Sequence, residues 1–190
     1  MEAVMLSVRP QWCELIASGK KTLEVRKTRP KLPTPFKCYI YCTQGEERWL
    51  VGIIGRHPSE KLNGKVIGEF VCGSYIGWGV NPLDGLYMIF PNELTAACIT
   101  GKDFEQYGNG KTLYGWHISA LQIYDKPREL SEFYRYCTEK DDCHKCIHWD
   151  NSYDNTYYEP PDPPFEGCMT GEKKHFTRPF QSWGYVEELT

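Results

Sequence analysis

The chain has 190 residues, of which 41% are hydrophobic and 14% aromatic, and its formal net charge at pH 7 is −3. This composition predicts a folded globular protein rather than a disordered one, and the acidic balance argues against binding of long polyanions over the whole surface. No apolar run reaches the length of a membrane span and the N-terminus lacks the pattern of a signal peptide, so we expect a cytoplasmic protein with no membrane partner.

Charge is distributed unevenly along the chain. Residues 1–40 contain eight Lys or Arg against three Glu, which gives this segment a charge of +5 and the remainder −8. A localised basic patch on an acidic protein suits a short or single-stranded nucleic acid, or one nucleotide, better than a long duplex. Ordinary clustering of charges is the alternative interpretation.

The predicted elements alternate between short helices and strands. Residues 4–8 read as a strand, and Pro10 suits the first turn of a helix that runs to residue 18 and stops at Gly19. Further strands are predicted over residues 21–27, 36–43, 65–75, 113–124 and 181–187, with short helices over 93–99 and 101–107 and after Pro127. The segment 177–183 is expected to close the sheet. The glycine-rich stretch around Trp78 is predicted to be a loop that closes over a cleft.

Three charged residues stand close together in the second predicted strand. Leu23 and Val25 alternate with Glu24 and Arg26, so the two charged side chains should project from one face, and Lys21 stands at the strand's entrance. A Glu held between Lys and Arg stays ionised and fixes the Arg, which leaves guanidinium donors for a planar or anionic ligand. A solvated, charged strand edge is the simpler alternative.

The spacing Gly-x-Lys-x-x-Glu-x-Arg, from Gly19 to Arg26, resembles the signature of the ASCH family, a branch of the PUA-like β-barrels. The segments 5–10, 65–71 and 116–118 are similar to the strands that surround this signature in ASCH domains. The resemblance implies an α+β fold, a PUA-like small β-barrel with short flanking helices, as a single domain over residues 1–190. It also implies a cleft beside the signature, to which Arg9 adds a base, and roles in RNA binding, RNA-associated regulation or, in some members, hydrolysis.

Binding of RNA or a modified nucleotide without turnover is the favoured hypothesis. The predicted ligand contacts are Arg9, Lys21, Glu24, Arg26 and Trp78, and the candidate surfaces for base stacking are Trp12, Tyr39, Tyr41, Trp78, Tyr114 and Trp116.

The alternative is an amidohydrolase that acts on an acylated nucleoside. Some ASCH-like proteins hydrolyse acylated cytidine with the signature lysine, a threonine and a distant glutamate, whereas this chain has Glu24 where they carry the threonine. As an enzyme it would use Lys21 and Glu24 as catalytic residues, with a second carboxylate from Glu69, Glu93 or Glu105.

The nine cysteines fall into two groups. Five lie scattered in apolar surroundings and are predicted to be small core residues: Cys13, Cys38, Cys42, Cys72 and Cys98. The other four define a cysteine-rich C-terminal insert over residues 137–168, with the spacing C-x5-C-x2-C-x21-C: Cys137, Cys143, Cys146 and Cys168.

The spacing within the insert predicts a structural zinc site that staples a polar, proline-rich segment. His144 or His148 could replace one thiolate, and an iron–sulfur cluster or four unliganded thiols are the alternatives. The insert also supports a third hypothesis for the chain's function, a protein-interaction surface.

Overall fold

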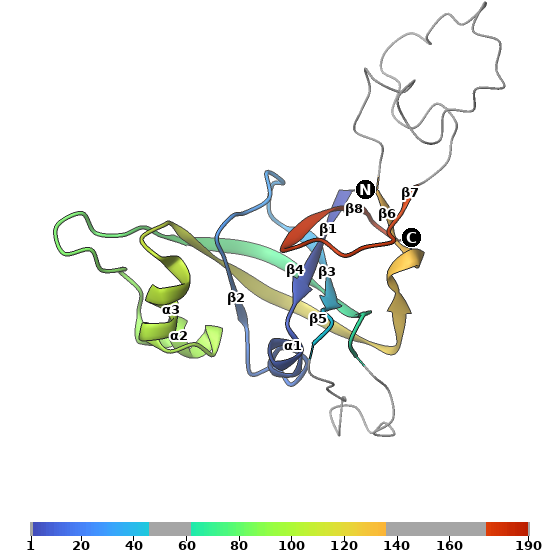
Figure 1. Cartoon of the computed structure of the whole chain (residues 1–190), viewed down its shortest axis with the longest axis horizontal. Helices are drawn as coiled ribbons and strands as arrows, with labels where there is room; N and C mark the ends of the chain where they lie inside the picture. The colour runs from blue at the N-terminus through green and yellow to red at the C-terminus, as the bar shows by residue number, and fades with distance from the viewer. Residues whose placement is uncertain (1, 46–61, 136–173, 190) are drawn as a thin grey trace, which may run out of the picture.

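The structure is a computed structural model that describes residues 2–45, 62–135 and 174–189. Its strands are β1 (Glu2–Val8), β2 (Leu23–Arg26), β3 (Phe36–Cys42), β4 (Lys65–Trp78), β5 (Leu113–Glu129), β6 (Tyr134–Arg135), β7 (Lys174–His175) and β8 (Trp183–Glu187). The helices are α1 (Pro10–Ala17), α2 (Pro91–Ala97) and α3 (Gly101–Gly108), with a 3-10 turn η1 at Leu130–Glu132. Figure 1 shows the long β4 and β5 strands side by side, with α2 and α3 at one end and β6, β7 and both chain ends at the other.

Six strands form one mixed sheet in the order β2-β5-β4-β3-β1-β8. β1 and β3 pair in parallel, whereas the other neighbours are antiparallel. A parallel pair needs a crossover connection, and here α1 and β2 lie in the chain between β1 and β3. The predicted α+β class is therefore confirmed.

The expected closed β-barrel is wrong for the described residues, because the sheet is open and β2 and β8 occupy its opposite edges. The sequence after β2 gives a physical reason. Residues 27–35 contain Pro30, Pro33 and Pro35, and proline has no backbone N–H to continue a ladder of hydrogen bonds. The two edges are instead joined by side chains: Trp183 Nε1 donates to Thr28 Oγ1 over 2.9 Å, and Tyr185 Oη accepts from the backbone N–H of Lys31 over 2.8 Å.

The central strands are buried on both faces, which explains why β1 reads as a nearly continuous apolar run. Alternate residues Val4, Leu6 and Val8 belong to one buried cluster, into which α1 inserts Cys13 and Ile16. The intervening Ala3 and Met5 belong to a second cluster on the other face. Cys38, Cys42 and Cys72 also lie in the first cluster and Cys98 is partly buried, so four of the five predicted core cysteines are confirmed.

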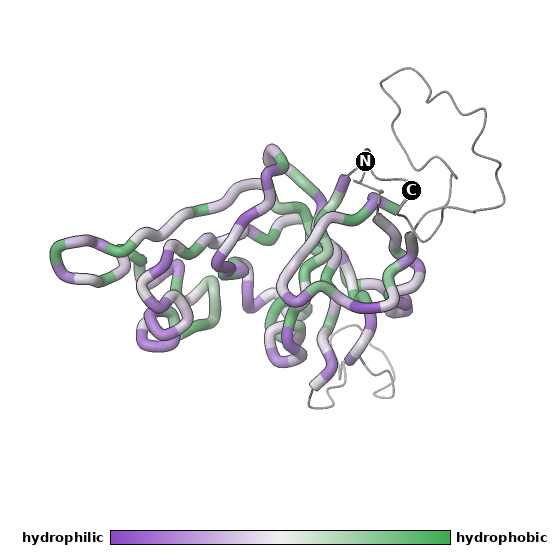
Figure 2. Tube along the Cα trace, turned by 45° about the horizontal axis from the view of Figure 1, so that its top comes forward, coloured by the Kyte–Doolittle hydropathy of each residue, from purple (hydrophilic) through white to green (hydrophobic). Residues whose placement is uncertain are grey.

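A third buried cluster lies beneath α2 and α3 and contains Leu23, Val25, Trp78, Phe104 and Leu113. Leu23 and Val25 therefore face the helices, and the period of two in β2 directs Glu24 and Arg26 to the opposite face. Figure 2 shows hydrophobic segments along the central strands.

Apolar residues are also found in the loop between β4 and α2, where Leu83 is 93% exposed and Met88 and Phe90 are also exposed. No helix in the described part of the chain is long and apolar enough to cross a membrane.

Candidate nucleic-acid site

Lys21, Glu24 and Arg26, called here the signature residues, form one buried ionic cluster. Lys21 Nζ lies 3.3 Å from Glu24 Oε2, and Arg26 donates to Glu24 Oε1 from Nε at 2.9 Å and lies 2.8 Å from it at Nη2. Lys21 and Glu24 are 5% exposed and Arg26 9%. The predicted juxtaposition is confirmed, and the alternative of a solvated strand edge is wrong, because these charges are almost completely removed from water.

Arg26 connects the two edges of the open sheet. Its Nη2 donates to Ser7 O of β1 over 2.7 Å, and its Nη1 donates to the carbonyl and hydroxyl oxygens of Ser182, at 3.3 and 3.2 Å. The Ser7 hydroxyl in turn donates to Phe180 O over 2.6 Å. The sequence predicted spare guanidinium donors for a ligand, and this is wrong, because Glu24, Ser7 and Ser182 already supply acceptors for all three nitrogens. A supporting role follows from these contacts.

Lys21 is held by three groups. Its ammonium donates to Ala97 O of α2 over 2.7 Å and lies 5.1 Å from the ring centroid of Trp12 on α1, in addition to its pairing with Glu24. These contacts fix a long, flexible side chain at the junction of α1, α2 and β2, because the ammonium has three donors and each contact restricts its orientation.

The face of the sheet on which Glu24 and Arg26 lie continues from β2 over β5 and β4. Glu24 stands opposite Trp116 of β5, which stands opposite Tyr75 of β4. In the next row, Arg26 stands opposite Tyr114, which stands opposite Gly77. Residues directly opposite in a sheet point to the same side, so these six residues share one surface, called here the signature face.

Trp116 is the innermost aromatic residue of this face and is fully buried. Its ring packs edge-on against Phe36 and Trp183. Its Nε1 is a buried donor with no hydrogen-bond partner among the described residues. A buried donor without an acceptor carries a desolvation cost.

Two further residues lie near the signature cluster from other elements. Arg9 is exposed at the residue that precedes α1. Burial raises the pKa of Tyr107 on α3, while the charges of Arg26 and Arg9 lower it and that of Glu24 raises it. The same tyrosine ring lies 4.9 Å from Lys27 Nζ. Sequence reasoning missed Tyr107, because only the packing of α3 brings it toward β2.

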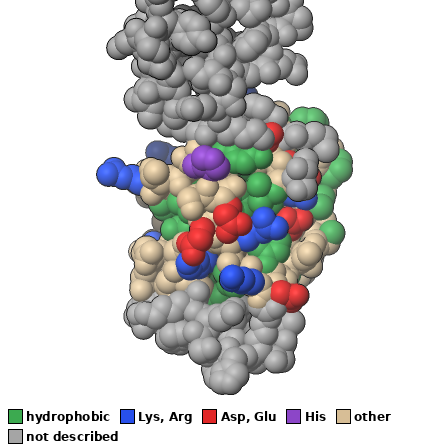
Figure 3. Space-filling model, turned by 90° about the vertical axis from the view of Figure 1, so that its right-hand side faces the viewer, with side chains coloured by type: hydrophobic (Ala, Val, Ile, Leu, Met, Phe, Trp, Pro, Cys, Tyr) green, Lys and Arg blue, Asp and Glu red, His purple; other side chains and the backbone are tan. Residues whose placement is uncertain are grey.

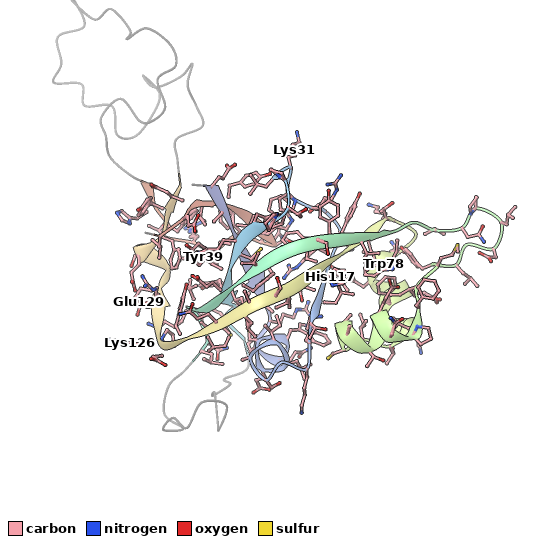
Figure 4. All side chains as sticks on the ribbon, turned by 180° about the vertical axis from the view of Figure 1, so that it is seen from behind. Lys31, Tyr39, Trp78, His117, Lys126 and Glu129 are labelled. Carbon is pink, nitrogen blue, oxygen red and sulfur yellow. The ribbon has the colours of Figure 1, made fainter. Side chains whose placement is uncertain are left out.

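Trp78 does not belong to this site, contrary to the sequence prediction. It ends β4 rather than lying in a loop, is 3% exposed, and donates from Nε1 to Glu93 Oε2 over 3.0 Å. Its ring packs edge-on against Phe104 and lies so close to Gly115 that a side chain there would overlap it. Figure 4 shows Trp78 and His117 on β4 and β5, whereas Lys31 projects from the loop after β2.

The basic residues beside the signature face differ in their ion pairing from the basic residues at the opposite end of β5. Lys27, Arg29 and Lys31 are exposed, and no carboxylate forms an ion pair with them within the described ranges. At the other end, Lys65 pairs with Glu129 and Arg128 with Glu132. Figure 3 shows that end of the molecule, where acidic and basic side chains intermingle.

Hydrolysis would require a second carboxylate, and two of the three residues predicted to supply it, Glu69 and Glu93, are engaged by other partners. Glu69 accepts from the Tyr124 hydroxyl and pairs with Lys37, while Glu93 caps α2 at Phe90 N and accepts from Trp78. Glu105 is exposed on α3. Among the described residues, Glu24 is the carboxylate within ion-pair distance of Lys21.

The predicted metal ligands Cys137, Cys143, Cys146 and Cys168 lie outside the described residues. Within residues 2–45, 62–135 and 174–189, no group of three or more His, Cys, Asp or Glu is arranged to hold a metal ion.

Three solved structures of an ASCH protein from Zymomonas mobilis resemble this chain. The first has 20% sequence identity and a TM-score of 0.49 over 67% of this chain and 73% of that one. A tyrosine-to-phenylalanine mutant and a serine-to-alanine mutant of that protein each have 22% identity over 67% of this chain, with TM-scores of 0.46 and 0.48 and coverage of 76% and 74% of their own chains. No protein-family model and no curated protein matches this chain. The matched structures are named for the same family whose signature the spacing from Gly19 to Arg26 resembles.

Proposed function

We propose that this chain is an ASCH-like protein that binds single-stranded RNA or a modified nucleotide at the signature face. The observation that carries the proposal is the contrast between two sets of charges on neighbouring residues. The signature residues are buried and paired with one another, while the adjacent Lys27, Arg29 and Lys31 are exposed without a carboxylate partner in the described structure. Such cations raise the local concentration of a polyanion and supply its phosphate contacts.

The two sets of charges have different roles in this proposal. Lys21, Glu24 and Arg26 form the rigid base of the site, because each is held by hydrogen bonds from at least two directions. Arg9 and Lys27 lie at its rim and contact phosphates. Specific recognition requires fixed groups in addition to charge, because phosphate contacts carry no sequence information.

The test is the salt dependence of binding to a fluorescein-labelled single-stranded RNA of ten nucleotides, measured by anisotropy. Arg9→Ala/Lys27→Ala is compared with Lys126→Ala/Arg128→Ala, which changes the charge equally at the opposite end of β5. Each lost phosphate contact makes the slope of log K against log salt shallower by about 0.7, so the first pair should lower the slope by about 1.4 and the control pair should leave it unchanged. Equal effects of both pairs, or no binding by the wild type, would overturn the proposal.

Hydrolysis of an acylated nucleoside is the second candidate, favoured by the 3.3 Å approach of Lys21 Nζ to Glu24 Oε2. A lysine beside a carboxylate can exchange a proton with a reacting group. Release of the acyl group from an N-acylated cytidine by the wild type, lost in Lys21→Met and retained in Lys20→Met, would support it. Lys20 is exposed and is therefore the matched control.

A further inference from the structure

The signature face also carries an arginine in contact with two tyrosine rings, and none of these three residues belongs to the signature spacing of residues 19–26. The Arg29 guanidinium carbon lies 4.4 Å from the ring centroid of Tyr75 and 5.8 Å from that of Tyr114, and Arg29 Nη1 donates to the Tyr75 hydroxyl. Arg29 is exposed, and both tyrosines are partly exposed. Arg29, Tyr75 and Tyr114 are called here the stacking platform.

The register places this platform beside the signature residues rather than elsewhere on the sheet. Tyr114 is the direct partner of Arg26, and Tyr75 lies in the same row as Glu24. On β4, the residue opposite Tyr114 is Gly77, and a methyl group at that position would meet the Tyr114 ring only at 3.7 Å, an ordinary contact. No side chain from β4 therefore covers Tyr114 in that row.

The chain segment that carries Arg29 has charges of one sign. No acidic residue stands between Glu24 and Glu46 in the sequence, whereas Lys27, Arg29 and Lys31 lie in this interval. Figure 4 shows Lys31 extending away from the sheet from the loop after β2. Cations at two-residue intervals next to aromatic rings are the combination that single-stranded nucleic acids require, since phosphates and bases must be contacted together.

We propose that the stacking platform is a base-binding subsite for single-stranded RNA. One base stacks on the exposed side of the Arg29 guanidinium, which is positioned by its contacts with the Tyr75 and Tyr114 rings, and Lys27 and Lys31 contact the flanking phosphates. A guanidinium plane and an aromatic ring are both common stacking surfaces for unpaired bases. This inference rests on the proposed function, because it extends the same site from the buried signature residues onto β5 and β4.

The experiment compares two probes of equal charge, a ten-nucleotide oligoadenylate and the same backbone without bases. Stacking of a base on a side-chain plane is worth about 5- to 140-fold in affinity. Tyr75→Leu removes the ring that positions the Arg29 guanidinium, so it should lose up to this factor for oligoadenylate and little for the abasic probe. Tyr75→Phe keeps the ring and loses only the hydroxyl that accepts from Arg29 Nη1, so it separates the contribution of the ring from that of the hydrogen bond. Arg29→Lys should also lose affinity for oligoadenylate while its salt slope stays that of the wild type, because the charge is kept and the plane is lost.

The outcomes separate the subsite from the proposed function. Wild-type binding that is unaffected by Tyr75→Leu and Arg29→Lys, but reduced by Arg9→Ala/Lys27→Ala, would overturn the subsite and leave the proposed function intact. No binding of either probe by the wild type would overturn both. Equal binding of oligoadenylate, the abasic probe and a polyaspartate peptide would overturn the subsite in favour of an acidic protein partner. Circular dichroism of each variant shows whether it is folded.

Discussion

Removal of Arg26 should destabilise the fold rather than only weaken a ligand. In Arg26→Ala the carbonyl of Ser7 and both oxygens of Ser182 lose a donor, and within the described part of the chain the buried Glu24 keeps Lys21 as its one ion-pair partner. Breaking a buried ion pair by removing one member costs about 3–5 kcal/mol, a large part of a typical stability of about 5–15 kcal/mol. For a chain of this length, that loss corresponds to a fall in Tm of about 6–20 °C.

The assay is equilibrium unfolding in urea followed by tryptophan fluorescence, with thermal melting as a second measurement. The matched control is Lys27→Ala, the next residue in the chain, whose side chain is exposed and whose loss should change stability by no more than about 0.5 kcal/mol. Glu24→Gln and the double variant with Arg26→Ala complete a cycle, in which residues of one network should couple by about 0.5–3 kcal/mol. An Arg26→Ala stability equal to that of Lys27→Ala would refute the reasoning that this side chain joins the sheet edges.

Two other predictions concern the cysteines. Burial raises the pKa of Cys72 from 9.0 to about 11 and also raises the pKa of Cys13 and Cys38. As pH rises, these thiols therefore ionise in the unfolded chain before they ionise in the folded one, so the free energy of unfolding should fall between pH 9 and 11. Urea titrations at several pH values measure this fall. A stability that is constant over that range, or a fall that Cys72→Ala leaves unchanged, would count against burial as the cause for this thiol. If Cys137, Cys143, Cys146 and Cys168 bind zinc as their spacing predicts, elemental analysis should find one zinc per chain, and a chelator should lower the Tm of the wild type but not that of Cys143→Ser. A metal-free wild type would end the zinc hypothesis, and visible absorption with bound iron would replace it by a cluster.

Local sequence signals were sufficient for the elements that carry the site. α1 begins at Pro10 and ends one residue before its C-cap Ser18, with Gly19 at a φ of +71°, as the positions of proline and glycine predicted. The period of two in residues 22–26 correctly separated Leu23 and Val25, which pack under the helices, from Glu24 and Arg26. These features depend on backbone preferences and on alternation, which a single sequence contains.

Long-range packing determined what the sequence did not predict. Trp78 was expected in a flexible loop because four glycines surround it, yet Gly115 and Phe104, far away in the chain, provide the space and the ring that bury it. The acceptors of Arg26 come from Ser7 and Ser182, separated from it by 19 and 156 residues. Tyr107 and Tyr75 reach the site only through the placement of α3 and the register of β4. No pattern of spacing contains that information.

The signature residues illustrate why one pattern can be read in two ways. An acid between two bases on one strand face suits a ligand site, and it also suits a buried network in which each charged group has a partner. Exposure separates the two interpretations. Arg26 is 9% exposed and donates to the carbonyls of Ser7 in β1 and of Ser182 just before β8, while Arg29, three residues later, is exposed and lies 4.4 Å from the ring centroid of a tyrosine. The ligand contacts of this chain are therefore expected one step outside the motif, on side chains that the buried cluster holds in place.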